Sequence, residues 1–233
     1  PVGEQFFIES VREGYKALPP GQQERWKDEV QGFVGQEATH RRIHGLFNAR
    51  IEQHGLVNDW EPRARARLKL IAGTDPRHGL AITAANEHFT ALFAEWMLAH
   101  TDLFDGCEPR LKALWLWHSA EEAEHKCTAF DLYRALGGDE SWRLRWMRRV
   151  TVIFLSDALR QTVANLRRDG TLWRWSTWRS GWRLLMGRDG LLRESYRPWR
   201  DYFRADFHPE QHHSERSQQW LREHQHLYTR VGA

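Results

Sequence analysis

The stretch WLWHSAEEAEHKCTAFD, residues 115–131, places histidines and carboxylates where the apolar face of a helix is expected. Residues three, four and seven apart share one face of an α-helix. His118, either Glu121 or Glu122, and His125 therefore point the same way. Apolar residues continue this stripe in both directions, as in a helix that faces a core. Buried imidazoles and carboxylates cost stability unless they are paired, neutralised or bound to a metal.

Acids recur on the apolar stripes of three earlier segments that are predicted to be helical. Dinuclear metal sites in four-helix bundles use one Glu from each of two helices and a Glu-x-x-His pair from each of the other two. The chain contains these groups in order, as Glu4, Glu37-Ala-Thr-His40, Glu87 and Glu122-Ala-Glu-His125. The spacing therefore predicts a carboxylate-rich site for two metal ions.

Some members of the ligand set stay open. Glu121 and Glu122 are alternatives for the same ligand position, and Glu4 is equally suited to be a first-turn acid that favours the helix dipole. His44 and His118 are additional to the usual ligands. They either bind metal directly, which we favour because both lie within about 60° of the ligand face, or orient a ligand through a hydrogen bond. Oxygen and imidazole ligands suit iron, or a manganese–iron pair, better than structural zinc.

The elements that must hold these residues are all helical, because strand-like alternation is nowhere sustained. Helices are expected over residues 3–18, about 22–53, about 77–100 and about 108–136. Proline and glycine pairs at or near their ends support these limits. We expect residues 1–138 to form a ferritin-like four-helix bundle that binds the metals, with residues 139–233 as additional helices packed on it.

The C-terminal part has an unusual composition. Residues 141–204 contain 15 Arg and no Lys, and eight of the 13 Trp lie at or after Trp142. This Trp/Arg-rich segment could fill gaps between outer helices while its Arg side chains reach water. It could also contact an anionic membrane surface. Nucleic acid is the least favoured partner, because no recognised RNA or DNA module is present.

Cysteine content and hydropathy bear on the compartment. Cys107 and Cys127 are the only cysteines, too few for a disulfide framework. No signal peptide is visible, and the longest apolar run, residues 150–155, is too short to span a bilayer. We therefore expect a cytoplasmic protein, with peripheral membrane contact as the alternative.

The order of the motifs FVGQEATHRRIH, LAITAANEHFTA, LWLWHSAEEAEHKCTAFDLY and YFRADFHPE resembles the bacterial family called predicted metal-dependent hydrolases, which is related to the ferritin-like superfamily. The resemblance covers nearly the whole chain. It implies a helical, di-iron fold, and the ligand set carries more functional information than the word hydrolase in the family name.

The function we expect is O2-dependent oxidation of a small or lipid-like organic substrate at two iron ions. An electron donor would supply the electrons. An apolar cavity would receive the substrate, lined by Phe33, Phe89, Trp115 and Trp117. A dinuclear metal-dependent hydrolase is the alternative enzyme. The alternative from another class of function is a ferritin-like protein that handles iron or redox equivalents. Such a protein would have no organic substrate. The oligomeric state that we consider for this chain is a homodimer.

Overall fold

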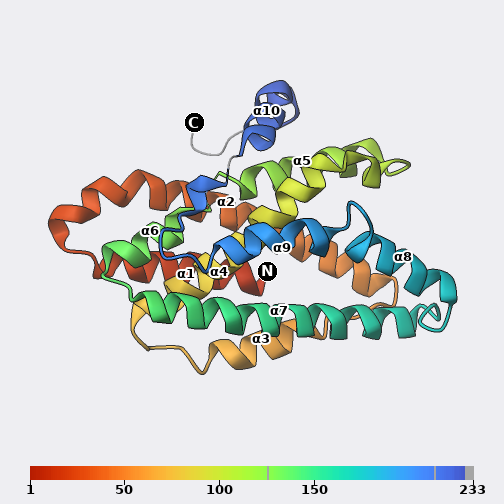
Figure 1. Ribbon diagram of the computed structural model, residues 1–233, viewed down its shortest axis with the longest axis horizontal. Coiled ribbons are helices and arrows are strands. Elements are labelled where there is room, and N and C mark those ends of the chain that lie inside the picture. Colours follow the sequence, from red (N-terminus) through yellow and green to blue (C-terminus); the bar gives the residue numbers. More distant parts are fainter. Residues whose placement is uncertain (125, 213, 229–233) are drawn as a thin grey trace.

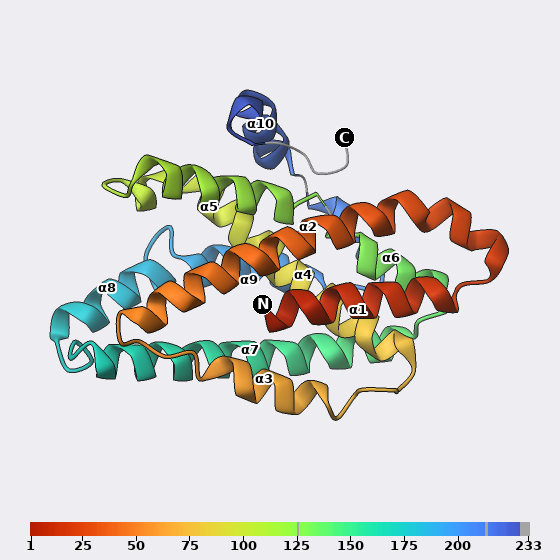
Figure 2. The ribbon, with the colours of Figure 1, turned by 180° about the vertical axis from the view of Figure 1, so that it is seen from behind.

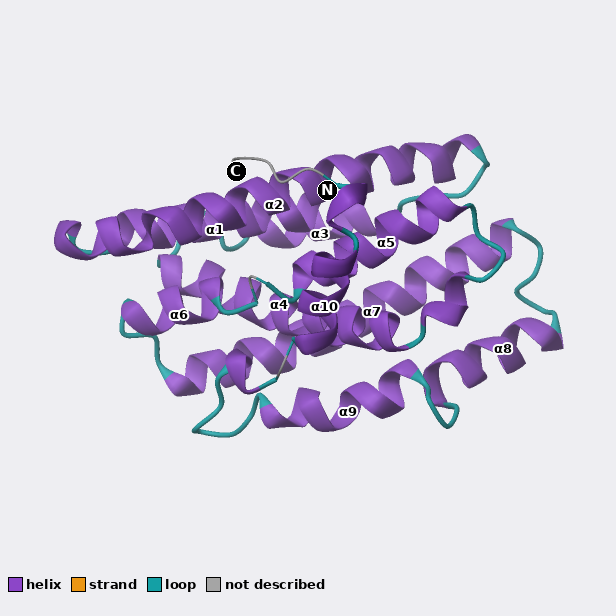
Figure 3. Ribbon diagram, turned by 90° about the horizontal axis from the view of Figure 1, so that it is seen from above, coloured by secondary structure: helices purple, strands orange, loops and turns teal. Residues whose placement is uncertain are grey.

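The computed structural model describes residues 1–124, 126–212 and 214–228, and no strand occurs among them (Figure 3). The predicted all-α class is confirmed. The α-helices are α1 (Val2–Ala17), α2 (Pro20–Gln53), α3 (Trp60–Leu68), α4 (Pro76–Ala99), α5 (Pro109–Glu122), α6 (Thr128–Ala135), α7 (Glu140–Arg168), α8 (Trp175–Met186), α9 (Leu191–Asp201) and α10 (Glu215–Glu223) (Figure 1). Short 3-10 helices occupy Thr101–Phe104, Pro209–Gln211 and Gln225–Leu227.

Helix α4 lies at the centre of the fold and packs against α1, α5, α6, α7 and α9 (Figures 1 and 2). Its sequence explains this position. Apolar residues and alanines occupy most faces of its first half, and a helix that is apolar all round is buried. Ala81, Ala84 and Ala85 are buried and small, so neighbouring helices can approach the α4 backbone closely. Helix α4 therefore carries Glu87 into the interior.

Local sequence signals explain where several helices begin and end. Helices α4, α5 and α7 each follow an acid whose side chain accepts a hydrogen bond from a backbone N–H of the first turn: Asp75, Glu108 and Asp139. Proline is the first residue of α4 and of α5, where its missing N–H costs nothing. Gly137, with φ 69°, adopts the left-handed conformation that ends α6.

The single helix predicted over about 108–136 is wrong, because the structure divides this segment into α5 and α6. Helix α5 ends at Glu122, residues 123 and 124 form a turn, and α6 begins at Thr128. Tertiary contacts stabilise the interruption. Ser214 donates to the carbonyl of Ala123 at 3.4 Å, and Lys126 donates to the carbonyl of His212 and to Ser214. Both helices pack against α4, but α5 also packs against α10, whereas α6 also packs against α1.

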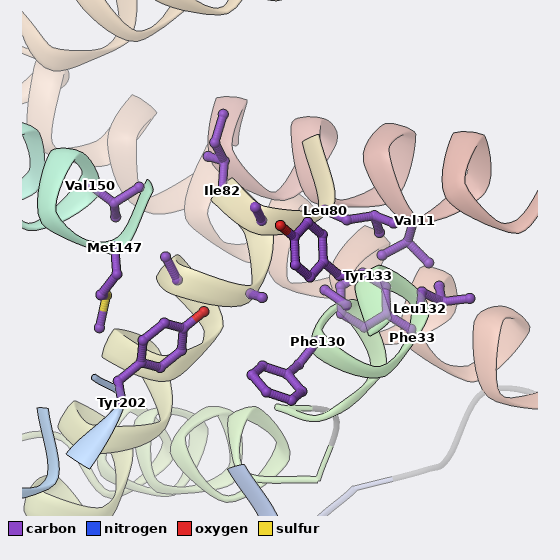
Figure 4. Packing of buried hydrophobic residues seen from close by; sticks show 14 of the residues in the cluster. Val11, Phe33, Leu80, Ile82, Phe130, Leu132, Tyr133, Met147, Val150 and Tyr202 are labelled. Atoms are coloured by element: carbon purple, nitrogen blue, oxygen red, sulfur yellow. The ribbon is translucent and has the colours of Figure 1, made fainter. Parts of the chain in front are cut away.

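The main core joins the N-terminal helices to α7 and α9. Val11, Leu80, Leu132, Met147 and Tyr202 belong to one cluster of buried side chains (Figure 4). A smaller cluster lies where α10 covers α5. The predicted division between residues 138 and 139 stays a prediction, although the main core includes residues from both sides of it.

Helix α3 is held against α7 by ion pairs. The buried carboxylate of Asp157 in α7 accepts from the Nε of Arg63 at 2.9 Å and from Arg67. Both arginines lie on α3, so the loop that follows α2 is tied to the fold by charge as well as by packing. No helix in the described part of the chain is both long and apolar enough to cross a membrane.

Leu132→Ala tests whether α6 is anchored in the main core. Leu132 is fully buried, so the substitution should lower the free energy of unfolding by about 2–5 kcal/mol through lost apolar contact and a residual cavity. Leu46→Ala is the matched control, because Leu46 is 64% exposed on α2. Urea denaturation of both variants measures the difference. Equal stabilities would contradict the position of α6.

Candidate metal centre

The imidazole of His40 is surrounded by carboxylates from two helices. Its Nδ1 atom lies 3.5 Å from an oxygen of Glu37, one turn earlier on α2, and 3.1 Å from an oxygen of Glu122 on α5. Its Nε2 atom lies 3.2 Å from an oxygen of Glu121. His40 has no exposed surface, and the three carboxylates are buried with it. The two nitrogens of His40 therefore face different acids of the Glu121-Glu122 pair.

Two groups of side chains bring their ligand atoms within 4.8 Å of one another. The first consists of His40, His118 and Glu122, and the second consists of Glu37, Glu87 and Glu122. These residues come from three helices that are far apart in the sequence, α2, α4 and α5. Glu122 is the residue common to both groups.

Three buried carboxylates this close to one another repel strongly. At an effective dielectric constant of about 20, two unit charges 4.8 Å apart cost about 3 kcal/mol. Burial raises the pKa of Glu87 well above its ordinary value, and the charge of Glu122 raises it further. Burial opposes protonation of His40, but its hydrogen bonds to Glu121, Glu122 and Glu37 raise its pKa well above the ordinary value. Protons therefore balance the negative charge when no cation does.

His118 has the opposite behaviour. Burial lowers the pKa of His118 to about 3, so its imidazole is neutral near pH 7. Its Nε2 atom has no hydrogen-bond partner among the described residues, and it lies 3.6 Å from an oxygen of Glu122. A neutral imidazole nitrogen beside a carboxylate is a ready metal ligand. Three carboxylates and two imidazoles, without thiolate, form a donor set that fits divalent metal ions.

Glu4 and His44 are brought to the edge of the cluster, outside both groups. Glu4 of α1 and Nδ1 of His44 are hydrogen-bonded to each other. The His44 ring lies 4.8 Å from the His118 ring, so the pair borders the centre. Glu121 contacts His40 and belongs to neither group. His125, which the sequence predicts as a ligand, lies outside the described residues.

The four aromatic residues expected to line a substrate cavity fall into two sets of contacts. Trp115 stacks with His44 at 5.9 Å, and Trp117 meets His40 edge-on at 5.8 Å. Phe33 and Phe89 instead belong to the main core, where Phe89 stacks on Phe154 of α7 at 5.4 Å. Of these four residues, the two tryptophans therefore lie beside histidines of the candidate centre or of its edge, and a shared cavity stays a prediction.

His88 has a structural position that its spacing does not indicate. It follows Glu87 in the sequence but points away from the cluster, and its Nε2 contacts the carbonyl of Pro198 at 3.1 Å. Burial lowers its pKa to about 3, so it is neutral near pH 7 and donates this hydrogen bond. The small number of charged residues in α4 is the signal that could have identified His88 as buried. It ties α4 to α9.

The fold and the cluster define an all-helical protein with a buried carboxylate–histidine centre. A family model described as "Predicted metal-dependent hydrolase" matches residues 1–213, and the chain belongs to this family. Neither the curated proteins nor the solved structures provide a match. The resemblance to this family is confirmed, and the relationship to the ferritin-like superfamily stays a prediction.

Glu87→Gln tests the repulsion within the cluster in metal-free protein. Glu87 has a folded-state pKa above the ordinary value of 4.5, so the folded state binds more protons than the unfolded state above pH 4.5. Stability contributed by this group therefore falls as pH rises. Glutamine has no such proton, and the variant should gain stability over the wild-type protein as pH increases.

Chemical denaturation of chelator-treated proteins between about pH 4 and pH 8 measures this difference. Glu13→Gln is the control, because Glu13 is an exposed acid on α1. Its stability should follow that of the wild-type protein across the range. A Glu87→Gln curve parallel to the wild-type curve would contradict the proposed repulsion.

Proposed function

We propose that the cluster binds two divalent metal ions that share Glu122. The observation that supports this is the membership of Glu122 in both ligand groups. One ion would be held by His40, His118 and Glu122, and the other by Glu37, Glu87 and Glu122. The positive charge of the ions would replace the protons that otherwise balance the buried carboxylates.

Glu121 has a different role in this proposal. His40 would bind metal through Nδ1, which lies on the side of Glu37 and Glu122. Its Nε2–H would donate to Glu121 at 3.2 Å. A carboxylate that accepts from the second nitrogen of a metal-binding histidine fixes the ring orientation and raises the basicity of the ligand. Glu122 is thus assigned as the ligand, and Glu121 as the residue that orients His40.

The activity we propose is metal-dependent hydrolysis, the activity that the family description names. Two adjacent ions supply polarisation of a carbonyl or phosphoryl oxygen and a water nucleophile at neutral pH. The protein positions the ligands through the His40–Glu121 hydrogen bond and keeps His118 neutral by burial. Trp115 and Trp117 shield the histidines from solvent. The centre is enclosed and carboxylate-rich, which strengthens electrostatic interactions with substrate.

Oxidation of an organic substrate with O2 is the second candidate. The donor set favours it, because carboxylates dominate, no thiolate takes part, and Glu37 and His40 have the Glu-x-x-His spacing of di-iron bundles. In this proposal α1, α2, α4 and α5 form a ferritin-like bundle. Iron, or a manganese–iron pair, would be the metal, and an electron donor would be required.

Substitution of the two adjacent acids tests the ligand assignment. Wild-type protein should contain about two metal ions per chain. Glu122→Ala should lose most of this metal, because both ions would lose a shared ligand. Glu121→Gln should keep it, since the amide oxygen still accepts from His40. Elemental analysis of purified protein measures the content. Loss in Glu121→Gln equal to that in Glu122→Ala would overturn the assignment.

Glu124→Ala is the matched control for this series. Glu124 lies two residues after Glu122, is exposed, and accepts a hydrogen bond from Gln36 on α2. Its removal should leave the metal content unchanged. Circular dichroism of all three variants checks that helicity is retained.

Hydrolysis of a panel of esters, amides and phosphoesters under nitrogen tests the activity. Protein loaded with zinc or manganese should turn over at least one substrate class, and Glu122→Ala should reduce the rate by at least about 100-fold. Glu124→Ala should keep the rate. Oxygen consumption by the iron-loaded protein, together with no hydrolysis in the panel, would favour oxidation instead.

A further inference from the structure

Helix α8 exposes a row of tryptophans to solvent. Trp175, Trp178 and Trp182 recur every three or four residues and so share one face. They are 79%, 47% and 68% exposed. The half-buried residues of α8 are Thr177 and Gly181, which lie to one side of the tryptophan face, with Gly181 about 60° from Trp178. An ordinary surface helix buries its apolar stripe, whereas α8 presents tryptophans to solvent.

The exposed face extends beyond the three tryptophans. Leu185 and Met186 continue it at the C-terminal end of α8, and both are exposed. Trp173, in the turn before α8, is 89% exposed. The face therefore combines indole rings with flexible aliphatic side chains. Bases of a nucleic acid would stack on the indoles alone, whereas lipid headgroups and acyl chains would accommodate both kinds of side chain.

Positive charge flanks this face. Arg179 and Arg183 lie within α8 and are exposed, and Arg174 precedes the helix. Helix α8 contains no Asp or Glu. None of the described ion pairs involves these arginines. The surface is therefore complementary to phosphate groups and to anionic headgroups.

The structure holds α8 in place at the edge of the molecule (Figures 1, 2 and 3). The Nε1 of Trp178 donates to the carbonyl of Leu172 at 2.7 Å, and Thr177 donates to the carbonyl of Thr171 at 3.0 Å. Helix α8 also packs against α9. The exposed tryptophans are thus presented on a fixed element, which lowers the entropy lost on binding.

We propose that α8 docks on the surface of a bilayer that contains anionic phospholipids. Trp175, Trp182 and the preceding Trp173 enter the headgroup region, and Arg179 and Arg183 contact lipid phosphates. The helix lies in the plane of the interface. This docking is independent of the metal centre, because α8 supplies none of the side chains in the two ligand groups.

Vesicle co-sedimentation of the full chain tests the proposal. Wild-type protein should pellet with vesicles of phosphatidylcholine and phosphatidylglycerol, and less with phosphatidylcholine alone. Trp175→Ser/Trp182→Ser should weaken binding by at least about tenfold. Arg179→Gln/Arg183→Gln should weaken it by about 25-fold at low salt, from about fivefold per arginine.

Matched controls separate this face from general surface effects. Leu46→Ser/Leu70→Ser removes two exposed apolar side chains elsewhere, and Arg12→Gln/Arg25→Gln removes the same charge from α1 and α2. Both control proteins should bind vesicles like the wild type. All variants should keep the wild-type melting temperature and metal content. Because metal content is measured separately from vesicle binding, a failure of the metal proposal can be told apart from a failure of this one.

Three outcomes would overturn the proposal. The first is no pelleting of wild-type protein with either vesicle. The second is a dimer in sedimentation velocity that the tryptophan variant abolishes, because α8 would then join two copies of the chain. The third is binding to single-stranded RNA, but not to vesicles, that depends on the same tryptophans.

Discussion

The main constraint on this fold is that the carboxylates of Glu37, Glu87 and Glu122 lie together in the buried interior. Each is buried, and their ligand atoms lie within 4.8 Å of one another. Such an arrangement is unfavourable unless protons or cations balance it. Helix α4 brings Glu87 to the centre because it is enclosed by other helices, and α2 and α5 bring the remaining acids with the histidines that accompany them.

The C-terminal helices support this centre rather than simply cover it. Helix α10 packs against α5, which carries His118 and Glu122. Contacts from residues 212 and 214 stabilise the turn after α5. The position of Glu122 therefore depends on residues about 90 positions later in the chain. A candidate metal site built this way is coupled to the packing of helices distant in the sequence.

The arginines of residues 141–204 have two distinct physical uses. Arg143 is buried, lies over the ring of Tyr202 at 4.7 Å and donates to the carbonyls of Tyr202 and Arg204, so it joins α7 to the segment after α9. Arg179 and Arg183 on α8 are exposed beside tryptophans. Composition alone cannot separate these uses, because both place Arg next to aromatic residues.

Helical periodicity determined much of this protein from its sequence. It indicated an all-helical chain and placed Glu37, His40 and Glu87 on inward faces, because the face of a residue within one helix follows from 100° per residue. The tertiary structure decided which of Glu121 and Glu122 joins both ligand groups and where the helix around them ends. These features depend on the rotation and depth of one helix relative to another, which are set by side-chain packing between segments distant in sequence.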